Sequence, residues 1–223
     1  MPWIDRSDHI RLVRAVDGVT YSLTAALVIV GLHAFYRVPV AWMPLVTVVP
    51  LFTATGATLA MPAMQAFPSN ARLVLVRLKL ASLCMAGFFF FFIWWGRIHE
   101  NLYLAVCSGV ALLGLAWYLL ELMNLLTRLL AIAGFRRTEL DARIAHAVVL
   151  YAFLVPILSV LTALIAGRLM TPVTSRIALA DLWRVAPAIV RAVVVLPPIM
   201  VISVLWRARS AVANAEKTGI DDA

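Results

Sequence analysis

Six long apolar stretches, with almost no charged side chains inside them, decide what this chain can fold into. A helix of about 20 mostly apolar residues crosses the hydrocarbon core of a bilayer. Backbone groups in lipid need partners within a helix or a closed barrel, and barrel strands are shorter and alternate in polarity. The pattern therefore predicts an all-α polytopic bundle of about six transmembrane helices. The predicted spans are Val19–Tyr36, Ala41–Met64, Leu78–Gly96, Leu102–Leu126, His146–Gly167 and Pro187–Trp206.

The overall composition supports the same class of protein. Hydrophobic residues make up 64% of the 223 residues and charged residues only 13%, which excludes a water-soluble globule and a disordered chain. The net charge of +8 comes from basic residues in the connections between apolar stretches. Such placement indicates membrane topology rather than nucleic-acid binding. The expected partners are the lipid bilayer and membrane or peripheral proteins, and no nucleic acid.

The distribution of basic residues predicts the orientation. Thirteen Lys and Arg residues lie on one predicted side and five on the other, with Arg191 inside the last stretch. The side richer in Lys and Arg faces the cytoplasm, so we expect both termini inside. The predicted divisions are a cytoplasmic amphipathic segment at 1–18, a transmembrane domain at 19–206 and a cytoplasmic polar tail at 207–223. The Arg-rich, Lys-poor usage indicates a bacterial inner membrane.

Two connecting segments carry further signals. Residues 5–17 alternate apolar and basic side chains at helical spacing, with Ser7 as a candidate cap. We expect this segment to be a helix lying on the anionic membrane surface. Residues 168–186 form the longest predicted external connection. Either an interfacial helix or a plain loop fits their sequence.

Charged and amide side chains inside spans are candidates for function. Glu121 and Asn124 stand three residues apart, which places them on one helix face. They suggest a proton or cation site, and the alternative is an interfacial Glu bonded to Arg128. Arg191 is a candidate to bind an anionic substrate, and the alternative is that its side chain extends to the membrane surface.

Histidines and cysteines offer little for a cofactor. A haem role for His33 requires a second ligand at similar depth, and His99 is the candidate partner. These two are the only candidate haem ligands, and packing at the interface is the simpler role for His33. Cys84 and Cys107 lie inside apolar stretches and do not have metal-site or disulfide spacing. We therefore expect no metal site and no cofactor.

The second predicted span has an unusual centre. Thr53, Thr55 and Thr58 lie between Pro50 and Pro62, near a pair of small residues, Gly56 and Ala60. Proline interrupts helices, and interrupted helices near the midplane hold substrate in many transporters. Pro197 and Pro198 stand in the middle of the sixth span. The hypothesis is a solute site between these two spans, and the alternative is kinked helices that only pack.

The sequence contains no phosphate-binding loop, zinc-protease motif or serine-hydrolase motif. An enzyme is therefore disfavoured, and no catalytic residue is assigned. The leading hypothesis is a permease or transport-type component whose substrate-binding residues are Thr53, Thr55, Thr58, Glu121, Asn124 and Arg191. A second hypothesis is a non-catalytic anchor or assembly subunit of a larger membrane complex. A third is a membrane redox anchor that binds haem or quinone.

Overall fold

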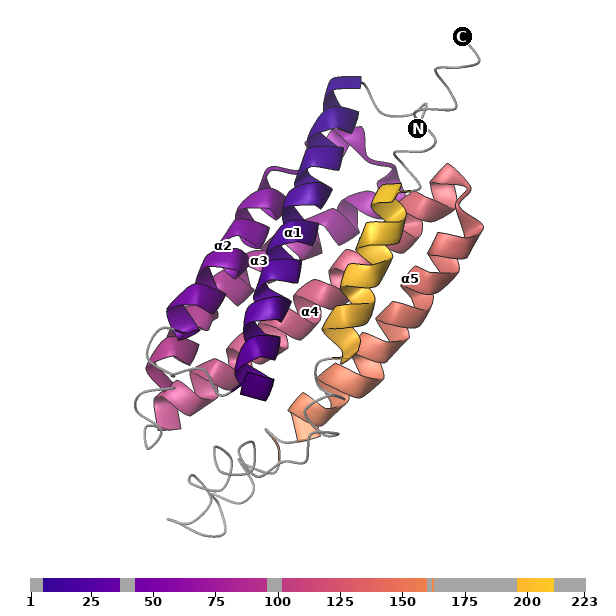
Figure 1. Ribbon diagram of the computed structural model, residues 1–223. Helices are drawn as coiled ribbons and strands as arrows, with labels where there is room; N and C mark the ends of the chain where they lie inside the picture. Colours follow the sequence, from indigo (N-terminus) through magenta and orange to yellow (C-terminus); the bar gives the residue numbers. More distant parts are fainter. Residues whose placement is uncertain (1–5, 37–42, 96–101, 160–161, 163–195, 211–223) are drawn as a thin grey trace.

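The computed structural model describes residues 6–36, 43–95, 102–159, 162 and 196–210, and every regular element among them is helical (Figure 1). The all-α prediction is confirmed for this part of the chain. Residues 155–159 continue the last labelled element as α-helix, and residues 196–210 form a further helix. The labelled elements are α1 (Arg6–Tyr36), α2 (Met43–Leu59), η1 (Met64–Ala66), α3 (Ser69–Trp95), α4 (Leu102–Ala133), α5 (Arg136–Val148) and the π-helix η2 (Val149–Leu154).

The helices pack side by side, with sequence neighbours in contact. α2 packs on α1 and on α3, and α4 packs on α3 and on α5. The helix over residues 196–210, drawn yellow, lies between α1 and α5 (Figure 1). Two ion pairs join it to these neighbours, Arg209–Asp17 at 2.7 Å and Arg207–Asp141 at 2.7 Å.

α4 is the central helix of the described bundle. In its apolar window 61% of the residues are buried, against 39% for the window in α1 and 22% for the window that begins in α5. Four of its large side chains are almost fully enclosed: Tyr118, Leu119, Met123 and Leu130. A side chain on the inner face of α4 is therefore surrounded by protein rather than by lipid.

Three described helices are long and apolar enough to cross a membrane. They cover Ser7–Ile29, Gly109–Ala133 and Arg136–Ser159, and a shorter apolar helix covers Val48–Leu59. Length and composition make the chain compatible with a membrane protein. The count of six spans and the cytoplasmic termini remain predictions.

The helices extend past the predicted spans at their polar ends. α1 begins at Arg6 and runs without a break into the first apolar stretch, so residues 6–17 are not the separate surface helix that we expected. α3 begins at Ser69 rather than near Leu78, and α5 begins at Arg136 rather than near His146. The apolar pattern predicts only the part of a helix that suits a lipid environment. The helix itself can be longer, because its backbone hydrogen bonds also form in water. The predicted connection at 168–186 lies outside the described residues.

Gly134 ends α4 and starts the turn into α5. Its φ of +80° is a left-handed conformation that glycine adopts without strain. The amide of Phe135 donates to the carbonyl of Leu130 at 3.0 Å, and the amide of Gly134 donates to that of Ala131 at 3.3 Å. These two bonds make a Schellman motif, so α4 and α5 form a tight helical hairpin.

The prolines of the second and sixth predicted spans stand at different places in the described helices. Pro50 lies inside α2, and Pro197 and Pro198 lie within the helix over residues 196–210. α2 ends at Leu59, three residues before Pro62. α2 therefore continues through Pro50 and ends before Pro62. Pro197 and Pro198 stand in the first turn of the last helix as it is described, and the residues before 196 lie outside the described part, so an interruption of the sixth span there stays a prediction.

α1 and α2 pack closely at Gly18, a glycine that the sequence did not single out. A Cβ added at Gly18 would lie 2.9 Å from the Cβ of Ala57, which is closer than two such atoms pack. A Cβ added at Gly56 would have no neighbour within 4 Å. The small residue that matters for this contact is therefore Gly18, because close helix approach needs a small side chain at the crossing.

We predict that Gly18→Ala destabilises the protein, because the new methyl group forces α1 and α2 apart. Overpacking of this kind costs about 1–3 kcal/mol. The measurement is the thermal unfolding midpoint in mild detergent. Gly56→Ala is the matched control and leaves the midpoint unchanged or slightly raised, since alanine favours helix. Equal midpoints for the two variants would show that the α1–α2 contact does not depend on Gly18.

Candidate functional site

Glu121 is the one carboxylate buried in the apolar window of α4. The exposed fraction of Glu121 is 8%. The indole Nε1 of Trp117 donates to Oε1 of Glu121 at 3.4 Å, and Nδ2 of Asn124 donates to Oε2 at 3.4 Å. These partners stand one turn before and one turn after Glu121, on the same face of α4. The predicted pairing of Glu121 with Asn124 is therefore present, and Trp117 completes it.

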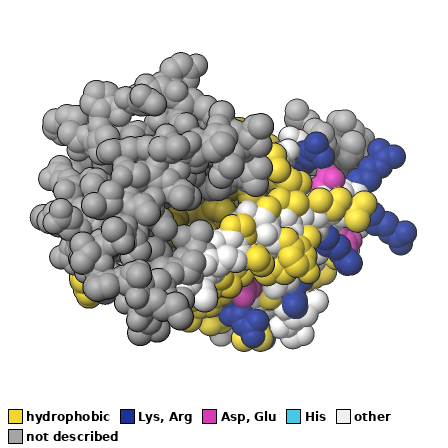
Figure 2. All heavy atoms as spheres, turned by 90° about the horizontal axis from the view of Figure 1, so that it is seen from below, with side chains coloured by type: hydrophobic (Ala, Val, Ile, Leu, Met, Phe, Trp, Pro, Cys, Tyr) yellow, Lys and Arg dark blue, Asp and Glu magenta, His cyan; other side chains and the backbone are white. Residues whose placement is uncertain are grey.

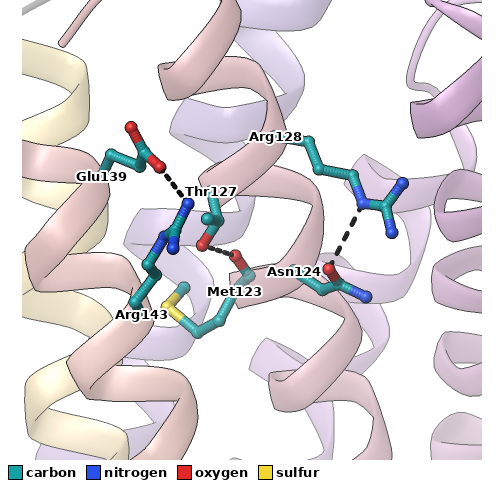
Figure 3. A network of polar contacts seen from close by, with 6 residues as sticks. All are labelled: Met123, Asn124, Thr127, Arg128, Glu139 and Arg143. Atoms are coloured by element: carbon teal, nitrogen blue, oxygen red, sulfur yellow. Dashed lines mark hydrogen bonds and ion pairs between the residues drawn. The ribbon is translucent and has the colours of Figure 1, made fainter. Parts of the chain in front are cut away.

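Asn124 is also hydrogen-bonded to a residue nearer the end of the bundle. Nε of Arg128 donates to Oδ1 of Asn124 at 3.4 Å, as Figure 3 shows. The Arg128 guanidinium also donates to the backbone carbonyl of Asn70, at the start of α3. Glu121, Asn124 and Arg128 therefore form a polar line along α4 that ends beside the exposed first turn of α3.

Glu121 has no positively charged neighbour in the described part of the chain. Its contacts are to neutral nitrogens, and no Lys or Arg side chain there makes an ion pair with it. Arg128 lies two turns away, about 10 Å along the helix axis. The expected alternative, a direct bond between Glu121 and Arg128, is not formed, because Asn124 lies between them and takes the Arg128 bond.

Other carboxylates pair with arginine. Glu139 contacts Arg143 at 2.5 Å within α5, on the other side of α4 from Arg128 in the view of Figure 3. Asp17 and Asp141 pair with the two arginines of the helix over residues 196–210. Surface ion pairs of this kind contribute little to stability. They show, however, that Glu121 differs from these three acids in its surroundings.

The three threonines of α2 do not line one site. Thr53 is exposed, and its hydroxyl donates to the Val49 carbonyl at 2.9 Å. Thr55 and Thr58 are buried on the opposite side of the helix. The hydroxyl of Thr55 donates to the carbonyl of Leu51 at 3.0 Å and lies 3.2 Å from that of Ser82 on α3.

Thr58 makes the direct side-chain link between α2 and α4. Its hydroxyl donates to the Ala54 carbonyl at 2.8 Å and lies 2.9 Å from the hydroxyl of Tyr118. Because the single Thr58 proton points to Ala54, the Tyr118 hydroxyl is the donor in the second bond. The sequence reasoning missed Tyr118. A phenol within a leucine-rich stretch was the available signal, but its partner 60 residues away could not be read from it.

Between the two spans of the proposed solute site, Met61 of the second predicted span and Leu205 of the last described helix line one apolar pocket, whose volume of about 10 Å³ is too small for a solute. Figure 1 shows α1 between α2 and the helix over residues 196–210. Tyr21 of α1 and Trp206 of the last described helix make a T-shaped ring contact, with their centroids 5.3 Å apart. Thr55 and Thr58 bond toward α3 and α4 instead.

The remaining candidates are not described. Arg191 and His99 lie outside the described residues. His33 belongs to α1, whose side chains are described only from Ser7 to Ile29. The anion-binding and haem hypotheses for these residues therefore stay predictions.

Comparison of the chain with family models, curated proteins and solved structures gave no match. The role of Glu121 is therefore inferred from its own surroundings.

We predict that Thr58→Val destabilises the protein, because it leaves the wholly buried Tyr118 hydroxyl without its acceptor. The expected cost is about 0.6–2 kcal/mol, the range for a hydrogen bond between membrane helices or a buried hydroxyl without a partner. Unfolding in detergent measures it. Thr53→Val is the control and has little effect, because that exposed hydroxyl bonds only within its own helix.

The double variant Thr58→Val/Tyr118→Phe separates a hydrogen bond from simple packing. Removing both polar partners recovers part of the lost stability, since no hydroxyl is left unsatisfied. Additive losses in the double variant would contradict the assignment of a coupled bond.

Proposed function

We propose that the chain is a multi-pass transport-type protein of a bacterial inner membrane, in which Glu121 takes up and releases a proton. Six crossings and cytoplasmic termini are part of this proposal. The observation that carries it is the buried carboxylate of Glu121, at the centre of the bundle and without a cationic neighbour among the described residues.

The positions of the ion pairs support the proposed topology. Asp17 near the start of α1 pairs with Arg209 near the end of the last described helix. Asp141 in the first half of α5 pairs with Arg207 of that same helix. Arg128, late in α4, bonds to Asn70 at the start of α3. The polar ends of five helices therefore meet at one end of the bundle, as both termini and the basic connections require.

A carboxylate inside a span has an energetic cost that packing alone does not explain. Ionised groups at membrane depth cost several kcal/mol and are kept mainly where they bind or move charge. A glutamine at 121 would keep one of the two acceptor atoms without that cost, since its other terminal atom is an NH2 donor. The retained acidity of Glu121 therefore supports a role that uses its proton.

The donor set favours a proton over a metal cation. Hard cations require about six oxygen ligands. Glu121 offers one carboxylate, and both of its oxygens face N–H donors from Trp117 and Asn124, which repel a cation. The amide oxygen of Asn124 is taken by Arg128. A single carboxyl group is sufficient to bind a proton, and the protonated form needs no counter-charge.

The polar line along α4 supports access from one side. Glu121 lies about 18 Å from the end of α4 at Ala133, measured along the helix axis. Asn124 and Arg128 occupy the next turns toward that end. Protons from the aqueous phase would reach Glu121 past these two side chains, and the proton gradient would supply the energy for transport.

The direct test follows the carboxyl group itself. In membranes reconstituted with the purified protein, we expect an infrared band of a protonated carboxyl group that titrates with pH and is lost in Glu121→Gln. Glu139→Gln is the matched control, because it removes a carboxylate that pairs with Arg143 at the surface, and it retains the band.

Proton flux provides the second readout. We expect proton movement into proteoliposomes under an imposed gradient for the wild-type protein and for Glu139→Gln. In Glu121→Gln we expect it to fall to the level of empty liposomes. Flux of wild-type size in Glu121→Gln, or a titrating band that persists in it, would overturn the role of Glu121.

A further inference from the structure

A small groove between α1 and α2 is lined by basic side chains and by small alanine side chains. It has a volume of about 230 Å³ and is lined by Arg11, Arg14, Ala15, Ala57 and Ala60. This volume is several times the roughly 30 Å³ that one water molecule occupies in the liquid. Ala57, which lines the groove, is also the residue that Gly18 of α1 packs against. The groove is therefore large enough for a group the size of a phosphate.

The two arginines of this groove are available to a ligand. Both side chains are exposed, and neither has a hydrogen-bond or ion-pair partner among the described residues. Of the acids nearest along α1, Asp17 is held by Arg209. Asp8, one turn before Arg11, is the remaining negative charge, so the groove carries a net positive charge.

The end of α2 does not repel an anion from the groove. Carbonyl groups at a helix C-terminus carry partial negative charge. Here Nζ of Lys79 donates to the carbonyls of Leu59 and Met61 at 3.3 and 3.2 Å, on either side of Ala60. The lysine offsets the negative end of the helix and adds a third cation next to the groove.

An exposed apolar strip continues from the groove along α2. Leu59, Phe52 and Val49 are all exposed, and with Gly56 they lie at helical spacing on one face. Elsewhere on the molecule, the described surface seen from below also has Lys and Arg side chains at the rim of a hydrophobic band (Figure 2). An anionic group bound by the arginines would have its acyl chains beside this strip.

We infer that the groove binds the phosphate headgroup of an anionic phospholipid between Arg11 and Arg14. The guanidinium groups match phosphate oxygens in geometry and charge. Ala57 and Ala60 leave room for the headgroup, and the apolar face of α2 holds the acyl chains. The inference requires only that the helices lie in a bilayer, and it holds whether or not Glu121 carries protons.

The test measures binding of phosphatidylglycerol to the purified full-length protein by native mass spectrometry in mild detergent, with phosphatidylcholine as the neutral lipid. We expect phosphatidylglycerol to bind in preference to phosphatidylcholine. We expect Arg11→Gln/Arg14→Gln to weaken that binding about 30-fold, which corresponds to the loss of two basic contacts with an anionic headgroup. Arg136→Gln/Arg137→Gln removes the same charge from an exposed site at the start of α5 and leaves the binding unchanged.

A second variant keeps both charges. Ala60→Phe fills the groove and is expected to weaken phosphatidylglycerol binding as strongly as the double arginine variant, which decides the question if that variant fails to fold. Equal losses in both double arginine variants would show diffuse attraction and overturn the site. So would unchanged binding in Ala60→Phe. Displacement of the lipid by inorganic phosphate at equal concentration would overturn the lipid assignment, because the acyl chains should add affinity.

Discussion

Hydrogen bonding within each helix is the interaction on which this structure depends. In hydrocarbon a carbonyl or amide must find its partner within its own helix, and the side-chain hydroxyls follow the same rule here. Thr20, Thr53, Thr58 and Thr127 each donate to the carbonyl four residues earlier. The hydroxyl protons of these threonines are therefore already used within their own helices. Such a threonine also links to a neighbouring helix where its oxygen accepts a second hydrogen bond, as Thr58 does from Tyr118.

This rule explains which part of the fold could be predicted. Apolar length predicts helices, and the described residues of the predicted spans are helical except for 60–63 in the second span. The ends of α1, α3 and α5 could not be placed, because helix stability in water depends on capping and packing rather than on hydropathy. α5 begins ten residues before the predicted span at His146 since Gly134 and its Schellman turn fix the preceding helix end.

The contacts of the candidate site also differ in how far the sequence could predict them. The pair Glu121 and Asn124 follows from spacing on one helix, and the structure contains that contact. The separation of Thr53 from Thr55 and Thr58 also follows from helical geometry, but which face is interior depends on the partner helix. Tyr118 required knowledge of a contact between distant segments. The spacing of residues predicts which side chains share a face of one helix. It does not predict contacts between helices that are far apart in the sequence.

The charges near the polar end show two different uses of arginine. Arg207 and Arg209 are paired with aspartates of other helices. Arg11 and Arg14 have no such partner in the described chain and face a groove instead. Arg128 lies between these cases, bonded to neutral oxygens at Asn124 and Asn70. Cations therefore occupy the polar end of the bundle, whereas Glu121 lies about two turns deeper and is bonded only to the neutral side chains of Trp117 and Asn124.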